Sequence, residues 1–191
     1  MDPLFQTIKK YITLTPEEEM ILTGLFERLP LKAGDYFLKE GKICRHVAFI
    51  EKGLLRYFIN DDSGEKTVFF SRENEFVCNY QSFLPRVAST KNIQALEDTR
   101  LRIISYDNLQ RLYREIREGE RFGRMAIEEV FLMAILQLDS LYTDTPEARY
   151  RQFLDLYPDL VQRIPQYYIA SYVGIKPPSL SRIRRRLSAR P

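Results

Sequence analysis

The spacing of apolar residues predicts that the chain begins with helices and continues with a β-rich stretch. A helical region is expected over roughly residues 3–29. There, Thr15–Glu18 has the form of a capping box with proline at the first helical position, and apolar residues follow at helical spacing (Leu22, Leu25, Phe26 and Leu29). From Leu31 to Ser105 the chain contains seven β-type runs: DYFL, HVAFIE, LLRYFIN, KTVFFS, EFVCN, NIQAL and LRIIS. Short strands separated by turn residues predict an antiparallel sandwich or small barrel.

Helical spacing returns after Ser105 and predicts a long helix over Glu118–Tyr142. A short helix over Asp107–Ile116 precedes it, and a further helix is expected to begin at Thr145-Pro146 and to end near Tyr157. The chain after Ser105 is therefore expected to be helical, without further strands.

The long predicted helix carries a heptad-like apolar seam formed by Ile127, Phe131, Ala134, Leu138 and Leu141. Because residues 130–136 are apolar at all seven positions, this helix is expected to be covered on more than one side. The simplest arrangement packs one face on the chain's own barrel and the other on a symmetry-related copy, which predicts a homodimer. Burial of the helix inside a single protomer is the alternative.

Residues 166–183, QYYIASYVGIKPPSLSRI, follow the pattern of a helix-turn-helix. Ala170 supplies the small residue that two crossing helices need where they meet, and Gly174 accepts the left-handed conformation that the tight turn requires. The remaining matches are apolar positions of a shared core: Ile169, Val173, Ile175, Leu180 and Ile183. An ordinary pair of antiparallel helices is the alternative.

The second helix of this motif, expected over residues 177–188, has an apolar face and a basic face. Leu180, Ile183 and Leu187 share the apolar face, and opposite them lie Pro178, Arg182 and Arg185, flanked by Ser179, Ser181 and Arg186. Arginine can donate two hydrogen bonds to a guanine edge, so this face suits the major groove of DNA. Arg182 is the predicted base contact, and Lys176, Arg186 and the amide end of the helix are predicted phosphate contacts. The predicted DNA-binding residues are Gln166, Lys176, Ser179, Ser181, Arg182, Arg185 and Arg186.

The distribution of charge strengthens this prediction. The 191 residues carry a net charge of +3, yet no acidic residue follows Asp159, and the last 32 residues hold seven basic ones. The preceding 159 residues hold 22 basic against 26 acidic residues. A basic end on a mildly acidic body predicts contact with a polyanion, and a solvated basic tail is the alternative.

Composition narrows the class of protein further. With 45% apolar and 29% charged residues and no run of 18 apolar residues, the sequence predicts an ordinary soluble protein without a membrane span or signal peptide, expected in the cytoplasm. Cys44 and Cys78 form no metal-binding pair, and His46 is the sole histidine, so no metal or cofactor is expected. The sequence contains no nucleophile–base pair or phosphate loop, which predicts a protein that is not an enzyme.

The order of these elements resembles the Crp/Fnr family of bacterial transcription factors. The resemblance is carried by LKAGDYFLKEGK and HVAFIEKGLLRYF, by KNIQALEDTRL and by IASYVGIKPPSLSRIRRRL. It implies an α+β fold: an antiparallel β-barrel (a jelly roll of the cyclic-nucleotide-binding type) with flanking helices over residues 1–117, a dimerisation helix over 118–143, and a helix-turn-helix domain over 144–191. It also implies double-stranded DNA, a second copy of the chain and RNA polymerase as partners, with Arg182 matching the arginine of the family's recognition helix.

Two departures from the family's pattern bear on specificity. Members that bind cyclic nucleotides carry Gly-Glu and Arg-Ser or Arg-Thr pairs, where this chain has Cys78-Asn79 and Ser89-Thr90. Because a cyclic phosphate needs close backbone amides and a paired cation, the residues predict that cyclic AMP is not the ligand. Pro177-Pro178 stands where the recognition helix often opens with Arg-Glu, so a different DNA sequence is expected.

Whether a small effector exists is left open by the sequence. The residues expected to contact one in the barrel are Asn79, Tyr80, Gln81, Arg86 and Thr90. The favoured function is a homodimeric, sequence-specific regulator whose two recognition helices lie about 34 Å apart. The alternative is a ligand-binding regulatory subunit whose C-terminal helices dock a protein partner, and a barrel enzyme of the cupin type is disfavoured. Target genes and the choice between activation and repression cannot be predicted.

Overall fold

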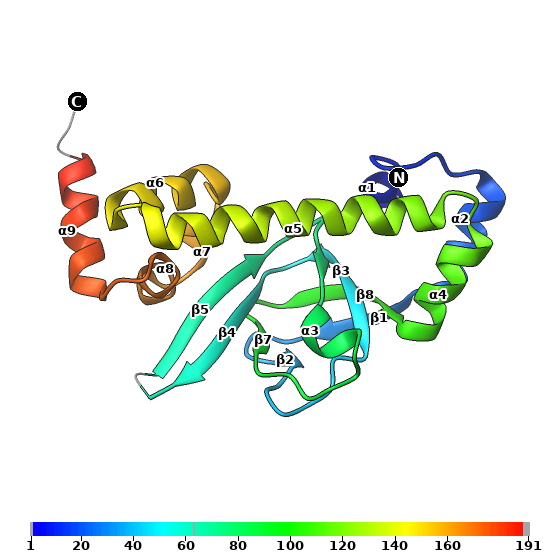
Figure 1. Cartoon of the computed structure of the whole chain (residues 1–191), viewed down its shortest axis with the longest axis horizontal. Coiled ribbons are helices and arrows are strands. Elements are labelled where there is room, and N and C mark those ends of the chain that lie inside the picture. The colour runs from blue at the N-terminus through cyan, green and yellow to red at the C-terminus, as the bar shows by residue number, and fades with distance from the viewer. Residues whose placement is uncertain (1, 63, 189–191) are drawn as a thin grey trace. The chain divides into compact units, whose positions relative to one another are not determined.

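The computed structural model describes residues 2–62 and 64–188, which form two compact units (Figure 1). Of the described residues, 2–58 and 70–130 make up the barrel unit, and 59–62, 64–69 and 131–188 make up the helical unit. Strands β4 and β5 and helix α5 each contribute residues to both units. Each unit is described separately below.

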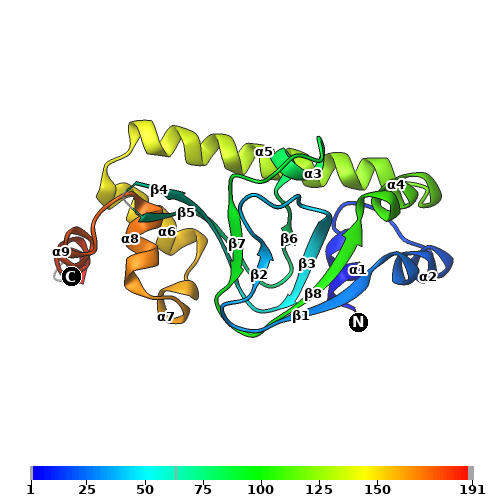
Figure 2. The same ribbon diagram turned by 90° about the horizontal axis from the view of Figure 1, so that it is seen from below.

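The strands form two four-stranded sheets, ordered β1-β8-β3-β6 and β2-β7-β4-β5. Figure 2 shows the strands of the barrel unit from below. Pairing is antiparallel between β1 and β8, β2 and β7, β3 and β6, β3 and β8, and β4 and β7. The strands are β1 Glu27–Leu31, β2 Tyr36–Leu38, β3 His46–Lys52, β4 Leu55–Asp61, β5 Gly64–Ser71, β6 Phe76–Val77, β7 Asn92–Ala95 and β8 Thr99–Ser105. The predicted α+β fold with an antiparallel barrel is confirmed, and all seven predicted strands are present.

Strand β1 corrects the prediction that residues 3–29 are helical. The helices there are α1, Pro3–Ile8, and α2, Pro16–Leu25, after which the backbone becomes extended at Phe26. Pro30 explains the change, because proline disfavours helical geometry in the residue before it. β1 lies at the edge of its sheet, where a missing amide is tolerated.

One apolar core joins both sheets to the helices that cover them. Phe49, Ile50 and Leu101 from the first sheet and Leu55 and Ile93 from the second are fully buried or nearly so. Side chains from α1, α2, α4 (Tyr106–Glu115) and the start of α5 complete this core: Leu4, Leu22, Leu25, Leu109, Leu112 and Phe122. The predicted capping box of α2 is present, since Glu18 N donates to Thr15 Oγ1 at 3.2 Å and Thr15 N donates to Glu18 Oε2 at 2.9 Å.

The helical unit follows from the middle of α5, which spans Gly119–Thr143. Its other helices are α6 Pro146–Leu156, α7 Leu160–Arg163, α8 Gln166–Val173 and α9 Pro177–Ser188. Thr145 caps α6 by accepting a hydrogen bond from Ala148 N at 3.2 Å. All of these except the short α7 agree with the predicted helices, and no helix of the described residues is long and apolar enough to cross a membrane.

Helix α5 exposes the apolar seam that the sequence predicts. Its large apolar side chains from Ile127 to Leu141 are 38–68% exposed, with Leu136 at 68% and Phe131 at 62%. Burial of this helix inside a single protomer, the alternative interpretation of the sequence, is therefore not what the structure shows.

Candidate nucleic-acid interface

The turn between α8 and α9 is made by Gly174. Its φ of 77° lies in the left-handed region, as the sequence predicts, and glycine adopts this conformation without steric cost. The amide of Ile175 then donates to the carbonyl oxygen of Ala170 at 2.9 Å, which closes the end of α8. The chain is thereby turned sharply before α9 begins.

A small apolar core fixes α9 against α8. Ile169, Ala170 and Val173 of α8 have no exposed surface, and Leu180 and Ile183 of α9 are 1% and 5% exposed. This packing is the one that the helix-turn-helix spacing predicts. Leu187, expected on the same face, is only half-buried.

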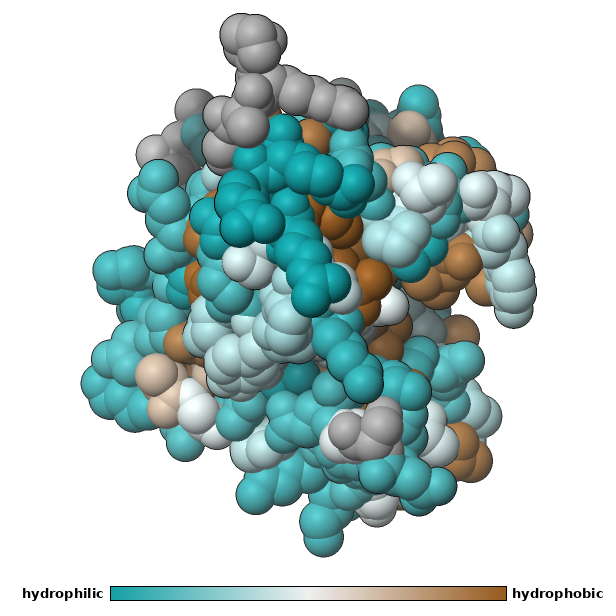
Figure 3. Space-filling view, turned by 90° about the vertical axis from the view of Figure 1, so that its left-hand side faces the viewer, coloured by the Kyte–Doolittle hydropathy of each residue, from teal (hydrophilic) through white to brown (hydrophobic). Residues whose placement is uncertain are grey.

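The opposite face of α9 is exposed and basic. Pro178, Ser181, Arg182 and Arg185 are all exposed, and within the described ranges neither of these two arginines has a hydrogen bond or ion pair. Figure 3 looks onto the face of the molecule where α9 lies, and hydrophilic side chains gather along that helix. The guanidinium groups of Arg182 and Arg185 are therefore free to meet a ligand.

The other predicted DNA-binding residues lie in more varied surroundings. Gln166 and Lys176 are exposed at the starts of α8 and α9, and Ser179 is half-buried. Arg186 Nη2 lies 3.3 Å from Glu147 Oε2 on α6, so this arginine already has a partner. Apolar spacing could not predict that pair, because it depends on how α6 docks beside α9.

The amide end of α9 does not match the prediction that it contacts a phosphate. Pro177 and Pro178 have no N–H group, and the amides of Ser179 and Leu180 both donate to the carbonyl oxygen of Lys176, at 2.9 and 3.2 Å. The first turn of α9 therefore offers no free backbone donor. Any phosphate contact near this end must come from side chains.

Arg149 of α6 is a positioning residue that sequence analysis missed. Its Nε donates to the carbonyl oxygen of Val173 at 2.8 Å, and its Nη1 donates to that of Asp144 at 2.8 Å. It therefore ties the ends of α8 and α5 to α6 and neutralises two carbonyl groups at helix C-termini. The pattern of apolar residues could not reveal it, since its partner Val173 lies 24 residues away.

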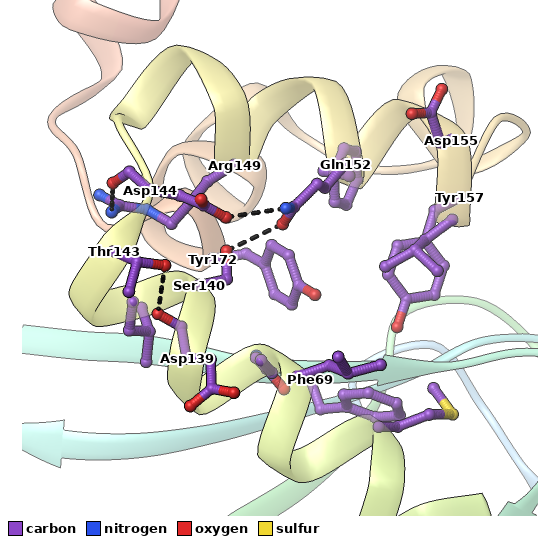
Figure 4. Close-up of a pocket in the computed structure, with 16 residues that line it drawn as sticks. Phe69, Asp139, Ser140, Thr143, Asp144, Arg149, Gln152, Asp155, Tyr157 and Tyr172 are labelled. Carbon is purple, nitrogen blue, oxygen red and sulfur yellow. Dashed lines mark hydrogen bonds between the residues drawn. The ribbon is translucent and has the colours of Figure 1, made fainter.

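A hollow of about 490 Å³ lies within the helical unit, beside this arginine (Figure 4). Its aromatic wall is formed by Phe69, Phe153, Tyr157 and Tyr172, whose neighbouring ring centroids are 5.4–6.4 Å apart. On another side, Ser140 Oγ donates to Gln152 Oε1 and Gln152 Nε2 donates to Asp144 Oδ2, each at 2.8 Å.

The predicted effector contacts belong to the barrel unit, between β6 and β7. We call residues 76–96 the cassette; it includes helix α3, Tyr80–Phe83. Asn79 is buried, and its Nδ2 donates to Ser89 Oγ at 2.7 Å, which joins the two ends of the cassette. These are positions where the resemblance leads one to expect the Glu and Arg of a phosphate site.

The remaining effector candidates do not share the environment of Asn79. The ring of Tyr80 lies against that of Phe83, with centroids 6.2 Å apart, and Gln81 and Thr90 are exposed. Arg86 adopts a left-handed φ of 56°, and its guanidinium lies 4.4 Å from the centre of the Tyr106 ring. The charge of Arg86 is thus directed to α4, where Asp107 lies 3.6 Å away.

The fold and the α8–α9 motif together define a protein with a cyclic-nucleotide-binding type of barrel and a helix-turn-helix. Residues 28–116 match the family described as cyclic nucleotide-binding domain. No curated protein matches the chain in sequence. Solved structures match a larger part of the chain than this family does.

Three solved structures share the fold over most of both chains. FixK2 from Bradyrhizobium japonicum is 14% identical with a TM-score of 0.74, covering 85% of this chain and 84% of that one. The catabolite activator protein of Thermus thermophilus is 23% identical with a TM-score of 0.59, covering 97% and 86%. A protein described as a Crp/Fnr-family transcriptional regulator from Eubacterium rectale is 16% identical with a TM-score of 0.67, covering 94% and 88%. This chain has the fold of these three structures, which confirms the predicted resemblance at the level of the fold.

Proposed function

We propose that this protein is a sequence-specific DNA-binding transcriptional regulator that acts as a homodimer. The observation that carries the proposal is the face of α9, where Arg182 and Arg185 are exposed opposite the buried Leu180 and Ile183. A helix of 12 residues is about 18 Å long, which suits insertion into a major groove. The absence of acidic residues after Asp159 removes repulsion from the phosphate backbone.

We assign each side chain of this face a contact with DNA from its position on α9. Arg182, at the centre of the exposed face and without a described partner, is assigned the bidentate contact with a guanine edge. Arg185 and Ser181 lie beside it, and Ser179, Lys176 and Gln166 are assigned to phosphates near the start of α9. Arg186 reaches DNA only by giving up its ion pair with Glu147.

The homodimer is supported by α5. A row of apolar side chains this exposed is unfavourable on a monomer in water, and two copies of the same helix would cover one another in an isologous pair. Two copies of α9 would then read a near-palindromic site with half-sites about 34 Å apart. We also propose that RNA polymerase is a further partner of the DNA-bound dimer and that the protein acts in the cytoplasm.

The cassette supports an effector other than cyclic AMP, or none. Asn79 and Ser89 satisfy one another by a hydrogen bond at the positions where a phosphate would need a carboxylate and a cation. Arg86, the sole arginine of the cassette, is paired with Asp107 and with the ring of Tyr106. We therefore expect cyclic AMP to leave DNA binding unchanged.

The test is fluorescence anisotropy of the full-length protein with DNA from upstream of its own gene, against scrambled DNA and across a salt series. We expect Arg182→Ala to abolish the preference for the native fragment, at a cost of about 1–3 kcal/mol. Lys176→Ala should weaken both DNAs equally and reduce the salt slope by about one.

The matched control is Arg111→Ala, which removes an exposed arginine of α4 that pairs with Glu115. It should leave both affinities unchanged. Steep salt dependence without sequence preference would reduce the function to phosphate binding. If no binding occurs even at low salt, the alternative of a subunit that docks a protein partner takes its place, and charge reversal of Arg182 and Arg185 would then leave function intact.

A further inference from the structure

The hollow of the helical unit is lined by a second face of α5. Residues 130–136 are apolar at all seven positions, and the seam proposed for dimerisation accounts for one side of the helix. Residues at helical spacing on another side, roughly a third of a turn from that seam, line the hollow: Met133, Leu136, Gln137 and Ser140. Met133 is 43% exposed and Leu136 is 68% exposed. A homodimer through the seam would leave these two apolar side chains facing the hollow.

Two rings of the aromatic wall present their surface to the hollow. Phe69 and Tyr172 are half-buried, whereas the other two rings of the wall are buried. Tyr157 meets Phe69 edge-on, with ring centroids 6.4 Å apart. The ring of Phe153 lies 5.4 Å from that of Tyr172, so each half-buried ring is held by a buried one. Because the face of an aromatic ring attracts both apolar groups and cations, this wall suits an apolar or positively charged ligand.

The charged side chains around the hollow are mostly acidic. Among the described residues of the lining, three carboxylates, those of Asp139, Asp144 and Asp155, stand against one cation, Arg149. The guanidinium of Arg149 already donates to the carbonyl oxygens of Val173 and Asp144. A carboxylate or phosphate group in the hollow would therefore meet net repulsion, whereas a cation would be attracted.

Asp144 is the carboxylate best placed to receive a positive group. It is half-buried, whereas Asp139 and Asp155 are exposed, so water and salt screen its charge least. Its Oδ2 accepts a hydrogen bond from Gln152 Nε2, and Gln152 Oε1 accepts one from Ser140 Oγ, each at 2.8 Å (Figure 4). This network fixes the side chain of Asp144. Since a carboxylate offers about four acceptor positions, a donor from a ligand can join these hydrogen bonds.

We propose that this hollow is a binding site for a small organic cation with an apolar body, of the class of protonated aromatic amines. The ammonium group of the ligand donates to the carboxylate of Asp144, and its ring packs against Phe69 and Tyr172. The volume of about 490 Å³ is in the range of small-molecule sites. Such a ligand contacts β5, α5, α6 and α8 of the helical unit and does not involve the cassette.

The experiment titrates full-length protein into three indole probes that differ in one group: tryptamine is cationic, tryptophol is neutral and indole-3-acetate is anionic. Because the chain has no tryptophan, indole fluorescence excited beyond the absorption of tyrosine reports on the probe alone. We expect tryptamine to bind about tenfold more tightly than tryptophol, and indole-3-acetate to bind more weakly than both.

The overall charge of the protein cannot produce this order of affinities. The chain carries a net charge of +3, which favours the anionic probe. A preference for the cation must therefore come from a local acidic site. Equal affinities for the three probes, tightest binding of indole-3-acetate, or no binding of any probe at millimolar concentration would each overturn the proposal.

Two variants assign the binding to the hollow. Asp144→Asn keeps the shape of the side chain and should lower the affinity for tryptamine about tenfold, to that of tryptophol, whose own affinity should not change. Phe69→Leu removes a ring but keeps an apolar side chain, and should weaken both probes by about fivefold. An unchanged preference for tryptamine in Asp144→Asn would place the cation elsewhere and overturn the site.

The matched control is Asp159→Asn, which removes the same charge from the helical unit at a residue that pairs with Arg163 outside the hollow. It should leave the affinities for all three probes unchanged. Far-ultraviolet circular dichroism checks that the variants fold, and the probe series on the parent protein stands independently of them. No measurement here involves DNA, so failure of the cation site and failure of the proposed function are distinguishable.

Discussion

At the scale of single residues, the left-handed backbone of Gly174 can be tested separately from side-chain packing. We expect Gly174→Ala to lower the free energy of unfolding by about 1 kcal/mol, because its φ of 77° is left-handed. A Cβ at this position would meet only Arg149 Nη2, at an ordinary 3.7 Å, so no clash contributes. Urea denaturation followed by circular dichroism gives the measurement.

The matched control is Gly24→Ala in the middle of α2. A Cβ there has no described atom within 4 Å, and the backbone is helical, so alanine should stabilise the chain by about 0.5–1 kcal/mol. Equal effects of the two substitutions would show that the left-handed turn is not what Gly174 provides.

At the scale of elements, the guanidinium group of Arg149 on α6 hydrogen-bonds the C-terminal ends of α5 and α8. We expect Arg149→Met to destabilise the helical unit by about 2 kcal/mol, because two half-buried carbonyl groups lose a charged donor while the aliphatic stem is kept. Hydrogen exchange should show the loss in α8 and α9. Arg151→Met, on the same helix, removes only a half-exposed pair with Glu147 and should cost less than about 0.5 kcal/mol. Similar losses from both variants would contradict the role of Arg149.

We expect the free energy of unfolding to depend on pH through Glu18, the capping carboxylate at the start of α2. Hydrogen bonds from the amides of Thr15 and Arg117 lower the pKa of Glu18 below the value of 4.5 that it has in the unfolded chain. A carboxyl group with a depressed folded-state pKa contributes stability that is present above pH 4.5 and is lost as pH falls through the folded-state pKa. Urea denaturation between pH 6 and pH 3 should therefore show a flatter acid decline in Glu18→Gln than in the parent. Glu128→Gln, at an exposed pair with Arg124, serves as control and should leave the slope unchanged.

Elements and local turns were predictable from the sequence because their causes lie within a few residues. The helical spacing of Leu180 and Ile183 and the glycine at 174 determine the α8–α9 motif, and both are local. The strand at Glu27–Leu31 was missed because apolar spacing continues past Leu25, although Pro30 prevents a helix there.

Contacts between distant segments were not predictable in the same way. Arg149 with Val173 and Arg186 with Glu147 each depend on the docking of whole elements. A single sequence records which residues can pair but not which strands and helices lie adjacent. For that reason the candidate DNA face could be predicted, while the residues that position it could not.

At the scale of the whole molecule, the proposal of a homodimer makes α5 the element on which DNA recognition depends. We expect Phe131→Glu, in the middle of the exposed apolar seam, to convert the dimer to monomers in light scattering, because each dimer would bury two carboxylates. Binding to a palindromic site should then fall by at least about 100-fold, since two linked half-site contacts become independent. Asp139→Ala changes an exposed polar position of the same helix and should preserve both the dimer and its affinity. A parent protein that is monomeric at micromolar concentration, or a Phe131→Glu variant that stays dimeric, would assign the seam to something other than a second copy of this chain.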